Sequence, residues 1–128
     1  MNREWKLIFD DFRESNKRMK EVLKMSYSVI IRDASIKRFE LTVELAWKTL
    51  KAFLKDQGVV CHSPKNCIQE AFRFGLIADD PEWIKMMEAR NISVHTYSEK
   101  FAEGLYSTLK EYTGLFKKLE DGLSKYYA

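Results

Sequence analysis

Apolar residues recur at steps of three and four along almost the whole chain, and this helical period is the feature that most constrains the fold. The one stretch of strand type, residues 58–61, is too short and too isolated to build a sheet. No internal repeat or shift in composition marks a second domain. A chain of 128 residues can bury a core without metals or disulfides. The sequence therefore predicts one all-α domain over residues 1–128.

Capping residues and helix breakers divide this pattern into five helices. Asp33 or Ser35 can cap the second helix, and Gly58 stops it. Ser63 is followed by a proline at the first helical position of the third helix, which ends at Gly75. The pair Asp80-Pro81 repeats this start signal for the fourth helix. The expected helices cover about residues 3–25, 33 or 35 to 58, 63–75, 80–90, and 98 onward.

The lengths of these helices and their connections predict the architecture. Long helices joined by short connections favour antiparallel neighbours, so we expect an up-and-down bundle of four main helices plus a short one. Leu41, Leu45 and Ala52 widen the apolar face of the second helix, which indicates that it lies in the middle of the core. A surplus of apolar positions on the long helices would suit a symmetric homodimer.

Charge, hydropathy and cysteine content exclude several classes of protein. A formal charge of +3 is too small for coating nucleic acid by charge alone. No apolar run approaches the roughly 18 residues of a membrane span, and the first residues lack the apolar core of a signal peptide, so we expect a cytoplasmic protein without a membrane partner. The spacing of Cys61 and Cys67 fits neither a zinc site nor a redox motif, and we expect free, reduced thiols.

The segment 90–97 gathers residue types that often serve in catalysis. Arg90 offers a permanently charged fork for phosphate oxygens, and His95 can take and give a proton near neutrality. On a continuous helix the two lie about 140° apart around the axis and would diverge. They converge if residues 92–94 open into a kink, or if a two-fold axis brings two copies into one cleft. Either arrangement points to phosphodiester chemistry.

A purely structural interpretation of the same residues stays open. Arg90 would then be a cap at the end of a helix, and His95 a partly buried, hydrogen-bonded imidazole. His62 lies in a loop between helices and carries no evident chemistry. The basic residues of the second helix suit a solvated face, where Glu44 and Lys48 form an ordinary pair four residues apart.

Three stretches of the sequence resemble the nucleotidyltransferase substrate-binding family, which belongs to the HEPN superfamily of helical nucleotide-binding domains and ribonucleases. The resemblance covers roughly residues 5–125 and implies the helical bundle expected above. It rests on the run RFELTVELAWKTLK at 38–51, on IQEAF at 68–72 with GLI at 75–77, and on residues 83–97, which end in ARNISVHTY.

This resemblance assigns roles within the segment 90–97. HEPN ribonucleases carry an arginine, a polar residue and, after four to six intervening positions, a histidine; Arg90, Asn91 and His95 match these places. HepT toxins of this branch have a tyrosine two positions after the histidine, which a minimal nucleotidyltransferase antitoxin adenylylates, and Tyr97 matches it. The family also implies a homodimer whose two motifs line one cleft, and it implies no metal or cofactor.

Three functions follow from these observations. The leading hypothesis is a HepT-like, metal-independent endoribonuclease in which Arg90, Asn91 and His95 act on RNA. The second is a non-catalytic subunit that binds a nucleotide or substrate for a separate nucleotidyltransferase, since this chain lacks that enzyme's signature of glycine, serine and paired aspartates. The third is a helical dimer that scaffolds an assembly.

Overall fold

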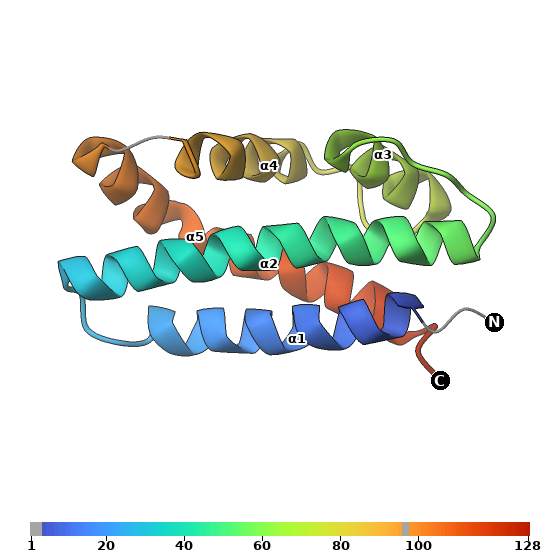
Figure 1. Cartoon of the computed structure of the whole chain (residues 1–128), viewed down its shortest axis with the longest axis horizontal. Coiled ribbons are helices and arrows are strands. Elements are labelled where there is room, and N and C mark those ends of the chain that lie inside the picture. The colour runs from blue at the N-terminus through green and yellow to red at the C-terminus, as the bar shows by residue number, and fades with distance from the viewer. Residues whose placement is uncertain (1–3, 96–97) are drawn as a thin grey trace.

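The computed structural model describes residues 4–95 and 98–128, and within these ranges the chain forms five α-helices and no strand. The predicted all-α class is confirmed. Figure 1 shows an up-and-down arrangement in which α1 and α2 run antiparallel, α3 and α4 follow one another along α2, and α5 returns across the bundle. The helices are α1 (Glu4–Leu23), α2 (Val29–Asp56), α3 (Pro64–Phe74), α4 (Glu82–Ser93) and α5 (Glu99–Ser124).

The bundle differs in one respect from the expected four main helices plus a short one. Three helices are long, with 20, 28 and 26 residues, and two are short, with 11 and 12. The short helices α3 and α4 together make one pass of the bundle (Figure 1). The break between them contains Gly75, whose φ of +94° ends α3 in the left-handed conformation that glycine adopts without steric cost.

The predicted cap of α3 and the predicted start of α5 are confirmed. The Ser63 hydroxyl accepts a hydrogen bond from the Asn66 backbone N–H at 3.1 Å, and the Ser98 hydroxyl accepts one from Phe101 at 3.2 Å. At the start of α4, the Asp80 side chain accepts from the backbone N–H of Glu82 at 3.0 Å. Each contact satisfies a backbone donor that the first turn of a helix leaves without an internal partner.

The predicted start of α2 is wrong. The helix begins at Val29, and its cap is Ser28, whose hydroxyl accepts from the Ile31 N–H at 3.0 Å. The first turn was missed because it shows no helical alternation of apolar and polar positions. Val29 and Ile30 are 53% and 79% exposed. Neither residue belongs to the hydrophobic core.

Helix α2 is the centre of the core, as its wide apolar face predicts, and it contacts each of the other four helices. A hydrogen bond of 2.7 Å between the hydroxyls of Ser15 and Thr42 joins α1 to α2 inside this core. None of the helices in the described ranges is long and apolar enough to cross a membrane. The largest fully buried side chains include Trp5, Phe9, Phe12, Phe39, Phe53, Trp83 and Phe116.

The expectation of free thiols is wrong, because Cys61 and Cys67 form a disulfide. The cap of α3 explains the pairing. Asn66 accepts a hydrogen bond from the His62 N–H at 3.0 Å, and this contact folds the preceding loop over the first turn of α3. Cys61, two residues before the cap Ser63, then lies beside Cys67, the fourth residue of the helix. The two Cα atoms lie 5.0 Å apart, and both cysteines are buried.

Candidate functional site

The predicted motif lies at the end of α4. Arg90 is in the last turn, and His95 follows two residues after the helix ends at Ser93. The helix extends beyond the expected end near Arg90 because the Val94 N–H donates to the Arg90 carbonyl at 3.2 Å, and the His95 N–H donates to the carbonyl of Ile92 at 3.1 Å. The backbone of Val94 is itself helical, with φ −73° and ψ −12°. This turn therefore contains no kink that would bring His95 back toward Arg90.

The guanidinium of Arg90 is bound on one side and partly exposed. Its Nη2 lies 3.0 Å from Oε2 of Glu44 on α2, and the side chains of the pair are 28% and 27% exposed. Its Nη1 lies 3.5 Å from Oδ1 of Asn91, at the limit of a hydrogen bond. The Nε atom is buried and has no hydrogen-bond partner among the described residues. The polar contacts of the Arg90 guanidinium are therefore with its neighbour Asn91 and with Glu44 of α2.

Glu44 contacts three side chains, those of Arg90, Lys48 and Trp47. The predicted contact with Lys48 is confirmed at 3.3 Å, but Oε2 also accepts a hydrogen bond from Nε1 of Trp47 at 3.1 Å. Burial would raise the pKa of this carboxyl group, but the bonds from Trp47 and Lys48 and the charge of Arg90 outweigh it, so the pKa lies below its usual range. Glu44 is therefore ionised at neutral pH.

His95 is exposed, so the alternative of a partly buried imidazole is wrong. Within residues 4–95 and 98–128, no hydrogen bond joins its ring to Arg90. An exposed imidazole can exchange protons with solvent and can meet a ligand. Tyr97, the predicted modification site, lies outside the described residues.

A pocket of about 630 Å³ lies between the first half of α2, the end of α4 and the start of α5. The hydroxyl of Ser93 donates a hydrogen bond of 2.6 Å to Glu40, which fixes the end of α4 to α2 at this pocket. No group of three His, Cys, Asp or Glu side chains in the described ranges could hold a metal ion. The lining residues are Arg32, Asp33, Ile36, Lys37, Glu40, Ser93, Val94, Ser98, Glu99, Phe101 and Ala102.

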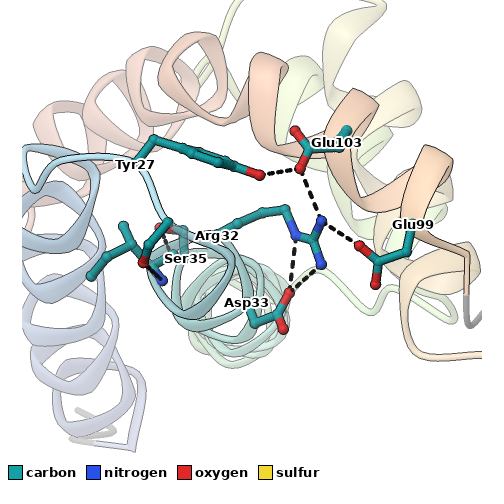
Figure 2. A network of polar contacts seen from close by, with 8 residues as sticks. Tyr27, Arg32, Asp33, Ser35, Glu99 and Glu103 are labelled. Carbon is teal, nitrogen blue, oxygen red and sulfur yellow. Dashed lines mark hydrogen bonds and ion pairs between the residues drawn. The ribbon is translucent and has the colours of Figure 1, made fainter.

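Arg32, which lines this pocket, pairs with three carboxylates (Figure 2). Its guanidinium pairs with Glu99 at 2.7 Å and Glu103 at 2.9 Å, both on α5, and with Asp33 at 3.0 Å. The Tyr27 hydroxyl donates to Glu103, and this bond raises the pKa of Tyr27 and lowers that of Glu103. The hydrogen bond to Glu99 makes the largest contribution to raising the pKa of Arg32, and those to Glu103 and Asp33 raise it further. The network attaches the first turns of α5 to the first turns of α2.

The roles of Glu44 and Arg32 were not predicted from the sequence. Both depend on contacts between helices, which helical spacing within one element does not reveal. For Arg32, the available signal is the spacing of Glu99 and Glu103, which places two carboxylates on one face at the start of α5. For Glu44, the sequence of α2 gives no such signal.

Comparison with known proteins adds an independent finding. The family model described as "Nucleotidyltransferase substrate binding protein like" matches residues 7–125. A curated Haemophilus influenzae protein named "Probable ribonuclease HepT" is 31% identical over 83 residues. That match covers 61% of this chain and 57% of the relative's length. The aligned part therefore spans little more than half of that relative.

Two solved structures share the fold. A crystal structure of a Thermus thermophilus protein has a TM-score of 0.78 and 33% identity, and the match covers 84% of this chain and 94% of that one. Haemophilus influenzae HI0074, described as revealing the fold of a substrate binding domain of a nucleotidyltransferase, has a TM-score of 0.68 and 24% identity. The match covers 94% of this chain and 96% of HI0074. The five helices are thus those of a known helical domain.

Proposed function

This chain belongs to the nucleotidyltransferase substrate binding protein family, and from that premise we propose that it is a metal-independent endoribonuclease of the HepT type. The observation that carries the proposal is the end of α4, where the partly exposed guanidinium of Arg90 precedes the exposed imidazole of His95 by five residues. The relative named a probable ribonuclease supports the same activity. The substrate is RNA, because the reaction uses a ribose 2′-hydroxyl.

The proposed reaction is an internal transfer of the phosphodiester. One imidazole takes the proton of the 2′-hydroxyl, and the oxygen forms a bond to the neighbouring phosphorus. The bond from phosphorus to the 5′ oxygen of the next nucleotide breaks, and that oxygen receives a proton from the second imidazole of the dimer. Arg90 neutralises charge on the phosphate oxygens, and Asn91 donates a hydrogen bond. The products are a 2′,3′-cyclic phosphate and a 5′-hydroxyl.

We propose that the active form is a homodimer, because one chain does not bring the two groups together. The end of α4 shows no kink toward Arg90, and no hydrogen bond among the described residues joins His95 to Arg90. A two-fold axis beside the end of α4 would place both motifs in one cleft. Exposed apolar side chains support an interface at the end of α4: Ile92 and Val94, which lie between Arg90 and His95 in the sequence, are 47% and 41% exposed, and Leu41 of α2 is 40% exposed.

The proposed partner is a minimal nucleotidyltransferase that acts as antitoxin. It would transfer AMP from ATP to the phenol oxygen of Tyr97, with release of pyrophosphate. Tyr97 lies two positions after His95 in the sequence, so an added nucleotide would block the cleft. The description of HI0074 as a nucleotidyltransferase's substrate binding domain supports a partner of this class.

A cleavage assay on the purified protein with single-stranded RNA tests the proposal. Arg90→Ala and His95→Ala should each lower the rate by about 10² or more, and EDTA should leave it unchanged. His62→Ala and Arg73→Ala are matched controls, since each changes the same residue type elsewhere on the surface and should retain the wild-type rate. Unchanged cleavage in Arg90→Ala and His95→Ala, or loss of cleavage in EDTA, contradicts the mechanism.

A second candidate function is a non-catalytic subunit that presents a nucleotide or substrate to the transferase. The pocket of about 630 Å³ beside the motif favours it, because that volume suits a bound small-molecule substrate. Co-purification and labelling with radioactive ATP separate the two functions. Label on wild-type protein but not on Tyr97→Phe, with loss of RNA cleavage, supports the toxin. Stable binding of the transferase without any RNA cleavage supports the presenting subunit.

A further inference from the structure

We infer that Glu44 is a positioning residue for Arg90: its carboxylate fixes the guanidinium in the orientation that meets the scissile phosphate. This inference rests on the proposed ribonuclease activity and adds a residue from a second helix to its site. It depends on three features of the structure, namely the anchoring of Glu44, the state of the Arg90 donors, and the local balance of charge.

Two contacts within α2 hold Glu44 in place independently of Arg90. The indole of Trp47 donates to Oε2 from one turn along the helix, and the ammonium of Lys48 lies 3.3 Å from Oε1. These two contacts come from residues three and four positions later, the spacing at which helical side chains meet. The side chain of Glu44 is also largely buried, which limits its rotamers. The carboxylate is therefore a preorganised acceptor.

The contacts of Arg90 leave part of its fork free for a ligand. Glu44 accepts from Nη2, and the Nε atom is buried away from solvent. The contact of Nη1 with Asn91 is long, at 3.5 Å, and is replaced readily by a better acceptor. A guanidinium carries five N–H donors, so donors on both terminal nitrogens remain for phosphate oxygens. Glu44 thus fixes the plane of the fork without saturating it.

The charge balance keeps this cluster attractive to phosphate. Arg90 and Lys48 share the single carboxylate of Glu44. The three groups together carry one net positive charge, because the ionised Glu44 offsets only one of the two cations. An anchor with two carboxylates would cancel the charge that the transition state needs. Glu44 therefore orients Arg90 while the cluster keeps a net positive charge that attracts an anion.

The test is a double-mutant cycle in the RNA cleavage assay. Glu44→Ala should lower kcat by about tenfold to a hundredfold, because small losses of orientation are costly in rate. In the Arg90→Ala background the same change should cause no further loss, since Glu44 acts through Arg90. Added guanidinium ion should restore part of the activity of Arg90→Ala but none in the double variant, which lacks the carboxylate that would bind it.

Two further variants control for folding and for general effects of charge. Glu44→Gln keeps the volume of the side chain and an oxygen acceptor, so it should fold. Its kcat should fall only about fivefold, because the bond to Arg90 remains but is weaker without the negative charge. The cycle is therefore also run with Glu44→Gln. Glu70→Ala removes a carboxylate paired with Arg73 at 2.6 Å on α3, away from the motif, and should leave kcat unchanged. Circular dichroism and sedimentation check the fold and assembly of each variant.

The outcomes separate this inference from the proposed function. Wild-type cleavage by Arg90→Ala would refute both. Loss of cleavage in Arg90→Ala together with a wild-type kcat in Glu44→Ala and Glu44→Gln would refute only the role of Glu44. Losses that multiply in the double variants, or guanidinium rescue that does not require Glu44, would show that Glu44 acts independently of Arg90 and would also refute it.

Discussion

Gly122 on α5 provides a sharp test of how the helices pack. A Cβ atom at this position would lie 2.6 Å from the backbone oxygen of Leu76, which lies in the connection from α3 to α4. Alanine is favoured over glycine inside a helix by about 1 kcal/mol, whereas overpacking against a fixed neighbour costs about 1–3 kcal/mol. Because a backbone oxygen cannot rotate away, we expect Gly122→Ala to lower the free energy of unfolding by up to about 2 kcal/mol.

Gly104 and Gly114 are matched controls in the same helix. A Cβ atom at either position would meet nothing within 4 Å. Gly114→Ala and Gly104→Ala should therefore raise the free energy of unfolding by about 0.5–1 kcal/mol. Urea unfolding followed by circular dichroism measures all three variants. A Gly122→Ala protein as stable as Gly114→Ala would refute the close approach of α5 to the start of the α3–α4 connection.

Two further predictions concern stability. Removing the disulfide by Cys61→Ser with Cys67→Ser should lower the free energy of unfolding by about 2 kcal/mol, because the short loop regains entropy in the unfolded chain; equal urea midpoints would contradict this. The pKa of Tyr27 is raised above its ordinary 10.0 by its bond to Glu103, so that bond stabilises the fold below this pH. The advantage of wild type over Tyr27→Phe should therefore be full below pH 10 and shrink as the pH rises above 10, and a constant difference would refute it.

Local rules predicted most of the fold. The cap at Ser63, the start at Ser98 and the stop at Gly75 depend on a few neighbouring residues, which the sequence displays directly. The start of α2 was missed where that logic fails, because exposed apolar residues such as Ile30 give no amphipathic signal. The pairing of Cys61 was missed because it depends on how a cap folds its loop, and spacing alone does not encode that geometry.

The candidate site was proposed from residue types, and its contacts between helices were not predicted. Arg90 and His95 were proposed because arginine is a residue type suited to binding phosphate and histidine is a residue type suited to acid–base catalysis. The pairing of Asn91 with Arg90 follows from their being neighbours. Glu44 lies 46 positions before Arg90, and only the packing of α4 on α2 brings the two together. Such a contact is a property of the bundle and has no local signature.

Comparison of the two paired arginines explains why one suits catalysis and the other structure. Arg32 is 2% exposed and pairs with Asp33, Glu99 and Glu103, so its surroundings carry two negative charges in excess. A phosphate approaching that network would be repelled, and the guanidinium has no accessible surface to offer it. Arg90 is partly exposed and shares one carboxylate with a lysine, which leaves positive charge facing a ligand. Exposure and charge balance, more than the presence of an ion pair, therefore distinguish the arginine proposed for catalysis.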